Sequence, residues 1–364
     1  MPRSSQQATT SGSQPPGLTT GVEFEFFAAC DYNSENVYQD KNTGYYILPT
    51  DQGQAFDVIK CEIEKVVTGG QKVHSQRPGD RRAVPDNNYD FYKRHWTVKK
   101  HESSMEATEG HSWHDVEITS PIMKPQDVSA TLFPVLNRLN STLKLCPDSS
   151  CAFQVHVGRG RGTFVLYEVL KIVTILWLGE SRLDQLYARH RIREGWAVGF
   201  REYPIRKESK YGSAREPASP LYNYWLQTPI ATGVSENTIS PNQAGRIQAM
   251  WGAETLKVLC ERMLLPKPSS HGAYFEYCAA YSFFNLVGSR DAEEPMKRTI
   301  EFRRPEGTLD PNVAVAWCKV FERIVYSGVF SDLEQFQALI GNLLNPDFAV
   351  FDFLTFIGCD PFYV

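Results

Sequence analysis

The clearest pattern in this 364-residue chain is a strict alternation of apolar and polar residues in several short segments. In TIEFRRPEGTLD, which spans Thr299–Asp310, Ile300 and Phe302 alternate with Glu301 and Arg303. Successive side chains of an extended strand point to opposite faces of a sheet, so this alternation predicts a strand with one apolar and one polar face. The residues Pro-Glu-Gly that follow predict a turn that ends the strand.

Three further segments show the same alternation and similar polar residues. The polar sides of the four segments carry carboxylates, an amide, an imidazole and a guanidinium: Glu23 and Glu25 in GVEFEF (Gly21–Phe26), Glu117 in VEI, Gln154 and His156 in AFQVHVG (Ala152–Gly158), and Glu301 and Arg303 in TIEFRR. Any one of these carboxylates could simply face solvent. Several of them on neighbouring strands would repel one another unless a cation lay between them. The pattern therefore predicts one shared, concave sheet face.

Apolar residues at helical spacing predict much of the remaining fold. The expected helices lie at about 53–68, 127–145, 163–190, 242–265 and 310–325, with a strand at 95–99 and one or two aromatic-rich strands within 274–286. Residues 1–18 are mainly Ser, Thr, Gln, Gly and Pro, which cannot bury enough apolar surface to fold, so we expect a disordered tail. No internal repeat or convincing linker interrupts the remainder, which predicts a single domain over residues 19–364.

Composition narrows the classes of function. A formal net charge of −4 gives no basic footprint for nucleic acid or for an anionic membrane. The eight cysteines are scattered without a CxxC pair, so reduced thiols are expected. The first residues show no secretory signal pattern, and the longest strongly apolar run, Ile172–Leu178, is too short to span a bilayer. We therefore expect a soluble, cytoplasmic protein.

The polar residues of the predicted sheet face suit a metal and a phosphate. Carboxylate oxygens are preferred ligands of Mg²⁺ and Mn²⁺, and the absence of cysteine from the set argues against structural zinc. An arginine on the same face could bind phosphate oxygens, so the combination points to phosphoryl transfer from a nucleotide. The chain has no Walker A pattern and no GxGxxG after a strand, which leaves neither a P-loop nor a Rossmann site.

Two basic segments have more than one interpretation. The run Gly158–Gly162 (GRGRG), which includes Arg159, precedes a helix and could hold a phosphate at the helix N-terminus or form a flexible turn. The segment at 187–207, rich in arginine and aromatic residues, is either a solvated basic face or a mobile loop that meets an anionic substrate. Three histidines earlier in the chain have no regular metal-ligand spacing, so a loop role is expected for His101, His111 and His114.

Taken in order, GVEFEF, VEITSPIM, AFQVHVG and TIEFRRPEGTLD resemble the amidoligase family of the glutamine synthetase and glutamate–cysteine ligase superfamily. The resemblance extends over about residues 20–330. It implies an α+β fold in which a curved antiparallel β-sheet has helices packed on its outer face, as in the catalytic domains of that superfamily. It also implies ATP, with Mg²⁺ or Mn²⁺, on the concave face, and amide formation from a carboxylate and an amine through an acyl phosphate.

The resemblance assigns roles by position in this sequence. The implied metal ligands are Glu23, Glu25, Glu117, His156 and Glu301. Catalytic roles are expected for Arg303 and Glu117, and nucleotide-binding roles for Arg303, Arg304, Gln154 and Arg159. The family's Trp-x-x-x-x-Asp-x-Ser segment looks like Trp96 through Glu102 and Ser104 here.

Two positions depart from the family pattern. The family usually has His-Val-His-Val-Gly where this chain has Gln154-Val155-His156. Glutamine can offer a metal only a neutral amide oxygen, which weakens a second metal site at that position. Glu102 replaces the usual aspartate, which keeps the charge on a longer side chain.

Together these observations predict an ATP- and Mg²⁺-dependent carboxylate–amine ligase. Its partners would be small, amino-acid-like carboxylates and amines, not nucleic acid or membranes, and the sequence is compatible with an oligomer. A first alternative is a non-catalytic protein on the same scaffold that binds a nucleotide or an amino acid. A second alternative is a phosphotransferase that acts on a small acceptor.

Overall fold

The computed structural model describes residues 17–78, 88–101, 112–193, 197, 199–200, 241–263, 279–287 and 297–360 of the chain. The strands are β1 (Thr19–Cys30), β2 (Tyr38–Gln39), β3 (Tyr46–Ile47), β4 (Lys72–Ser75), β5 (His95–Lys99), β6 (Ser112–Thr119), β7 (Leu145–Cys146), β8 (Phe153–Gly158), β9 (Tyr281–Ser282) and β10 (Thr299–Phe302). The α-helices are α1 (Gln52–Glu64), α2 (Tyr89–Tyr92), α3 (Val128–Thr142), α4 (Leu166–Leu183), α5 (Arg189–Arg193), α7 (Pro241–Trp251), α8 (Leu256–Met263), α9 (Pro311–Phe330), α10 (Leu333–Leu344) and α11 (Val350–Phe356). Short 3₁₀ helices form at Pro125–Asp127 and Phe284–Leu286.

The main sheet has eight strands, ordered β4-β5-β6-β1-β8-β10-β9, with β7 pairing to β1 off this path. All of its pairs are antiparallel except β4 with β5, which is parallel. Strands β2 and β3 form a separate two-stranded sheet. The chain is therefore a mixed α and β structure with a mostly antiparallel sheet, as predicted, and the parallel pair at one edge is a departure from the fully antiparallel sheet that we expected.

Strand β1 is the centre of the sheet, because it pairs with β6 on one side and with β8 on the other. Its residues Val22, Phe24 and Phe26 are fully buried on one face, as the alternation of GVEFEF predicts. The same face of β8 carries Phe153 and Val155. These apolar residues form the floor on which helices pack.

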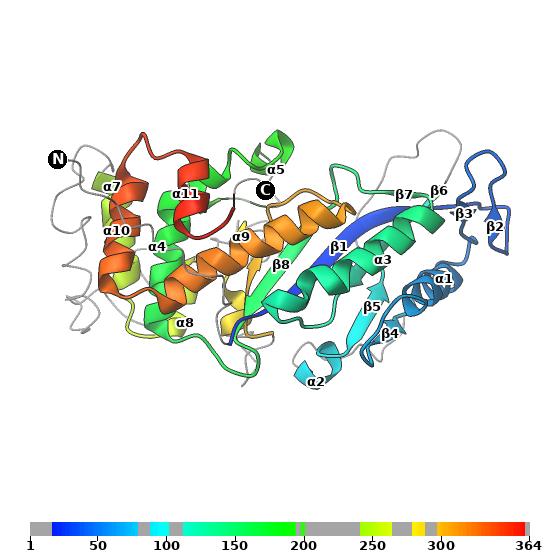
Figure 1. Cartoon of the computed structure of the whole chain (residues 1–364), viewed down its shortest axis with the longest axis horizontal. Coiled ribbons are helices and arrows are strands. Elements are labelled where there is room, and N and C mark those ends of the chain that lie inside the picture. Colours follow the sequence, from blue (N-terminus) through cyan, green and yellow to red (C-terminus); the bar gives the residue numbers. More distant parts are fainter. Residues whose placement is uncertain are drawn as a thin grey trace, which may run out of the picture.

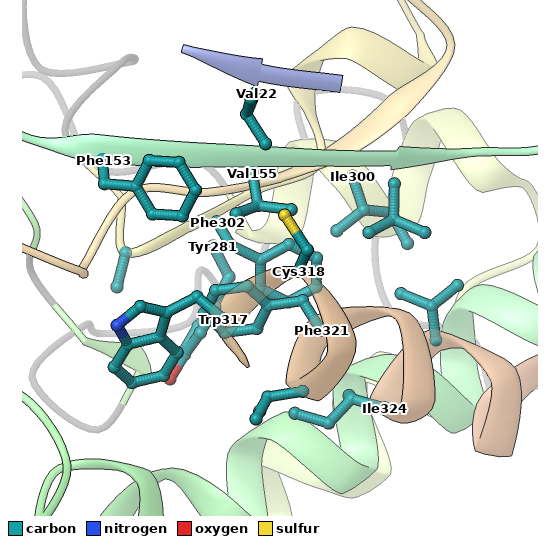
Figure 2. Close-up of a cluster of buried hydrophobic side chains, with 14 of the residues drawn as sticks. Val22, Phe153, Val155, Tyr281, Ile300, Phe302, Trp317, Cys318, Phe321 and Ile324 are labelled. Atoms are coloured by element: carbon teal, nitrogen blue, oxygen red, sulfur yellow. The ribbon is translucent and has the colours of Figure 1, made fainter. Parts of the chain in front are cut away.

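Helices α3 and α9 lie across this apolar face, in front of β1 and β8 in Figure 1, and α1 packs beside α3 over β4 and β5. Figure 2 shows Val22, Val155 and Phe302 of the sheet pointing toward Phe321 and its neighbours on α9. The rings of Phe302 and Phe321 stack with centroids 4.2 Å apart. Helix α9 is preceded by its N-cap residue Asp310, whose carboxylate accepts a hydrogen bond from the backbone N–H of Asn312.

A second group of helices gathers around α4 at one end of the molecule, where α7, α8, α10 and α11 lie (Figure 1). Almost every side chain of α4 from Val169 to Glu180 is buried, in agreement with its apolar sequence on all sides. It crosses α9 so closely that a Cβ added to Gly328 would lie 2.2 Å from Ile172 Cγ1. This contact joins the helical end to the layer that covers the sheet.

Most predicted elements are present, and three details differ. The predicted helix at 242–265 is interrupted, because α7 ends at Trp251 and α8 begins at Leu256. The predicted helix at 163–190 ends at Leu183, and a separate short α5 follows. Helix α9 continues to Phe330, five residues beyond the expected end. The predicted disordered tail falls almost entirely outside the described residues.

Two features of the described residues concern the cysteines and the apolar helices. Each of the seven cysteines in the described part of the chain is free. Within the same residues, none of the helices is both long enough and apolar enough to cross a bilayer.

Candidate functional site

The strand register brings the predicted polar residues onto one face of the sheet, opposite the helix layer. Glu25 lies opposite Glu117 on β6, and Glu23 lies between Thr119 of β6 and Gln154 of β8. One step further along, His156 lies opposite Glu301 of β10. Six predicted residues share this face and are each at most 8% exposed: Glu23, Glu25, Glu117, Gln154, His156 and Glu301. We call these six residues the acidic face.

Glu23 lies near the middle of the acidic face and contacts two basic groups. Lys297 donates a hydrogen bond from Nζ to Glu23 Oε1 over 2.7 Å, and His156 Nε2 lies 3.1 Å from the same oxygen. Burial disfavours the ionised carboxylate, but Lys297 and His156 outweigh it and hold the pKa of Glu23 well below its usual range. Glu23 in turn helps to raise the pKa of Lys297 above that of a free lysine, despite the burial of its ammonium group.

Glu117 responds differently to the same surroundings. Burial raises its pKa, and so do the neighbouring carboxylates of Glu23 and Glu25, although Lys99 Nζ lies only 2.8 Å from Glu117 Oε1. Lys99 comes from β5, where the register places it directly opposite Glu117. The face therefore contains one strongly ionised carboxylate and one that is more easily protonated.

Glu25 has hydrogen-bond donors around both of its oxygens. Oε2 accepts the backbone N–H of Ala152 over 2.7 Å, and Oε1 accepts the amide N–H of Gln154 over 2.5 Å. His101 Nε2 lies 3.1 Å from Oε1, and this contact raises the pKa of His101 even though burial opposes it. Glu25 is thus held in place by Ala152, which precedes β8, by Gln154 of β8, and by His101, two residues beyond the end of β5.

Glu301 closes the acidic face on the β10 side. Its Oε1 lies 3.2 Å from Arg303 Nε, and its Oε2 accepts a hydrogen bond of 3.1 Å from Asn285 Nδ2. The carboxylate and the guanidinium of the TIEFRR segment are therefore side by side, as the alternation predicts.

One buried polar atom of the acidic face, Gln154 Oε1, has no hydrogen-bond partner. The Gln154 amide nitrogen donates to Glu25, so this residue is fixed by one polar atom and leaves the other without a bond. His156 is held on both sides, since its Nδ1 lies 3.2 Å from Thr299 Oγ1 and its Nε2 lies 3.1 Å from Glu23 Oε1. Buried polar atoms are rarely left unsatisfied, and such atoms beside carboxylates indicate a missing partner.

The donor set suits Mg²⁺ or Mn²⁺ in kind, since it consists of carboxylate oxygens, an amide oxygen and one imidazole. In the ranges that the structure describes, however, no three His, Cys, Asp or Glu side chains are gathered closely enough to hold a metal ion as they stand. The reason is that lysine, arginine and histidine side chains contact the carboxylates. A divalent cation would have to replace some of these contacts.

Two predicted nucleotide-binding residues lie away from the acidic face. Arg304 is 1% exposed and contacts Asp184 Oδ1 at 2.5 Å and Glu180 Oε1 at 3.4 Å, both from α4 or its end. Arg159 forms an ion pair with Glu168 near the start of α4. Both arginines lie beyond the ends of β8 and β10 and contact residues of α4 or its end, and only Arg303 among the predicted arginines is beside the carboxylates.

Sequence reasoning found Arg303 but missed the other three cations of the face, Lys99, His101 and Lys297. Lys99 shares the alternation of HWTVK with Thr97, but only the pairing of β5 with β6 shows that it lies opposite Glu117. His101 was assigned to a loop role, and the contact with Glu25 now places it at the site. Lys297 lies outside any regular element, and no sequence signal marks it. Two residues of the expected Trp96 segment, Glu102 and Ser104, lie outside the described residues.

Among the arginines of the basic segment at 187–207, Arg191 has a clear position. Arg191 is 3% exposed, and its guanidinium donates to the backbone carbonyls of Arg303 at 2.8 Å and Arg304 at 3.4 Å. It therefore holds the end of β10 and is not part of a solvated basic face. Most of the rest of this segment lies outside the described residues.

Comparison with known proteins bears on the first three fifths of the chain. The model of a family described as "Putative amidoligase enzyme" matches residues 16–220, which is more than half of the chain. The matched range includes β1, β5, β6 and β8, and β10 with Glu301 follows it. No curated protein matches the chain.

Proposed function

Because this chain belongs to the amidoligase family, we propose that it is an ATP- and Mg²⁺-dependent ligase that joins a carboxylate to an amine. The observation that carries the proposal is the acidic face, on which Glu23, Glu25, Glu117 and Glu301 are buried together by three different strands. Burying several carboxylates on one surface is costly unless cations accompany them. A face of this kind suits a substrate that arrives with metal ions.

The proposed reaction has two steps that balance. A carboxylate oxygen of the first substrate attacks the terminal phosphorus of ATP, which gives an acyl phosphate and ADP. The amine nitrogen then attacks the acyl carbon, a C–N bond forms, and inorganic phosphate and a proton leave. No protein nucleophile is required, so the side chains act by binding, orientation and charge stabilisation.

The described residues offer distinct roles in this scheme. The proposed metal ligands are Glu23, Glu25, Glu117, His156 and Glu301, with the amide oxygen of Gln154 as a neutral donor. A bound divalent cation would supply neutralisation of charge on the phosphate oxygens. Arg303, fixed beside Glu301, is suited to stabilise negative charge on the transferred phosphoryl group.

A second candidate is a binding protein without turnover on the same scaffold. Two observations favour it: Gln154 stands where the family pattern has a histidine, and the carboxylates already contact cations of the chain itself. Such a protein would bind a nucleotide or an amino acid and release it unchanged. The two candidates differ in ATP consumption.

The first test measures ATP consumption with Mg²⁺ across a pool of amino acids and amines, with mass spectrometry of the nucleotides and condensed products. ADP together with an amide product supports the ligase. AMP would contradict the proposed chemistry, and nucleotide binding without turnover would support the binding protein.

A matched pair of variants tests the role of the acidic face. We predict that Glu301→Gln lowers ATP turnover by at least about 100-fold, because the neutral amide keeps the shape of the side chain but removes the charge that holds a cation. The control is Glu306→Gln, an exposed residue of the turn after β10. Circular dichroism should show both variants folded, and full turnover in Glu301→Gln would contradict the assignment.

A further inference from the structure

The acidic face is electrically balanced by side chains of the chain itself. Each of its four carboxylates lies beside at least one basic side chain, and the pairs are Glu23 with Lys297, Glu25 with His101, Glu117 with Lys99, and Glu301 with Arg303; His156 also contacts Glu23. A divalent cation that entered this surface alone would leave it with excess positive charge. Uncompensated charge in a buried site is strongly unfavourable, so the cation needs an accompanying anion.

The two lysines approach the face from opposite sides. Lys99 belongs to β5, and Lys297 lies just before β10, with β6, β1 and β8 between these strands. Glu23 lies between the lysines: it contacts Lys297 and is also stabilised by the charge of Lys99. Their ammonium groups therefore flank the place where a cation would meet Glu23 and Glu117.

The lysines are the members of these pairs that can move. The side chains of Lys99 and Lys297 are 35% and 28% exposed, whereas their partners Glu117 and Glu23 are 9% and 8% exposed. A lysine ammonium group sits on a flexible four-carbon stem, while the carboxylates are fixed on strands. Replacement of the lysine by a divalent cation would leave each carboxylate in place and release an ammonium group at the rim.

We propose that Lys99 and Lys297 couple the binding of a divalent cation to the binding of a polyphosphate. The cation displaces their ammonium groups from Glu117 and Glu23, and the released groups then bind phosphate oxygens of a nucleoside triphosphate. Neither ligand binds well alone, because the cation alone or the polyphosphate alone leaves the buried face with uncompensated charge. The proposal rests on the proposed function and identifies the residues that bind the anionic ligand. The unpartnered atom Gln154 Oε1, on a side chain that is 4% exposed, is independent evidence that this face takes a ligand.

The test measures Mn²⁺ binding by electron paramagnetic resonance, with and without a non-hydrolysable ATP analogue, corrected for the metal–nucleotide complex in solution. In the unmodified protein the analogue should tighten Mn²⁺ binding about tenfold or more, and by linkage Mn²⁺ should tighten binding of the analogue equally. Lys297→Met and Lys99→Met should each bind Mn²⁺ alone more tightly and should lose most of this coupling. Lys297→Arg should keep it.

The control is Lys60→Met, in which the lost lysine lies on α1 and contacts Glu64 at 3.8 Å, away from the acidic face. It should match the unmodified protein in both measurements, and circular dichroism should show that all variants are folded. The proposal is overturned if Lys297→Met and Lys99→Met match Lys60→Met. It is also overturned if they bind Mn²⁺ more tightly but keep the full coupling, because the lysines would then only compete with the metal.

The failure of the proposed function would look different. If the unmodified protein binds neither Mn²⁺ nor the analogue, alone or together, then both proposals are wrong. If it binds both without any coupling, the coupling proposal fails and the ligase proposal stands.

Discussion

Stability of this chain should depend on the ionisation of Glu322, a carboxyl group on α9 that lies between the helix and the sheet. The residue is buried, and the hydroxyl of Thr20 on β1 donates a hydrogen bond to its carboxyl group. Burial raises the pKa of Glu322 to about 7, although the Thr20 hydrogen bond and the charge of Arg323 act in the opposite direction. Cys318, one turn earlier on the same helix, carries no positive charge and so does not stabilise the ionised carboxylate of Glu322.

The way in which stability changes with pH follows from the direction in which the pKa of Glu322 is shifted. The folded state holds the Glu322 proton more tightly than the unfolded state does, so the stability due to the neutral acid is fully present below pH 4.5 and is lost as the pH rises through about 7. The difference between 4.5 and about 7 corresponds to roughly 3 kcal/mol at 1.36 kcal/mol per pKa unit. Glutamine has almost the same shape as the neutral acid and does not titrate.

We therefore predict that Glu322→Gln is more stable than the unmodified protein at pH 8, and that the advantage shrinks to below about 1 kcal/mol at pH 5. Urea unfolding at several pH values measures the free energy of unfolding of both proteins. Other titrating groups cancel in the difference. The matched control is Glu334→Gln, which makes the same chemical change at an exposed residue of α10. A pH-independent difference for Glu322→Gln, or a loss of stability at pH 8, would refute the reasoning.

Two further pairs of substitutions test contacts of the helical end. Gly328→Ala should destabilise the protein by about 1–3 kcal/mol, because the added Cβ would lie 2.2 Å from Ile172 Cγ1. In Gly341→Ala on α10 the added Cβ meets nothing within 4 Å, so this variant should be slightly more stable, and thermal unfolding compares the two variants. Arg304→Met should cost about 3–5 kcal/mol in urea unfolding, because it leaves the buried carboxylate of Glu180 without its guanidinium, and Arg304→Lys should recover part of that loss.

The strands that carry the candidate site could be predicted because their physical signal is local. Alternation with period two is imposed by the geometry of a single strand, so Glu23 and Glu25 could be assigned to one face without knowledge of their neighbours. The prediction that Gln154, His156 and Glu301 share that face also holds, because residues at one register position of adjacent strands point the same way.

The two lysines of the site could not be predicted in the same way, for two different reasons. Lys99 lies on a predicted strand, but only the pairing of β5 with β6 shows that it faces Glu117. Lys297 precedes β10 outside any periodic pattern, so only the folded chain shows its contact with Glu23. Helix ends were also imprecise, because the apolar pattern of 242–265 continues through a break that depends on tertiary packing.

The position of Arg303 depends on residues that never touch the acidic face. Strand β10 has only four residues, Thr299–Phe302, and its ladder stops before Arg303. Beyond that point the chain is held from the helix side: Arg191 donates to the carbonyl of Arg303, and the buried Arg304 is paired with Glu180 of α4. A guanidinium that must meet a phosphoryl group has to be fixed before the substrate arrives, because ordering it during the reaction would cost free energy. Arg191 and Arg304 therefore fix the position of Arg303 from the helix side. Of these three arginines, Arg303 is the one whose charge acts on the substrate in the proposed reaction.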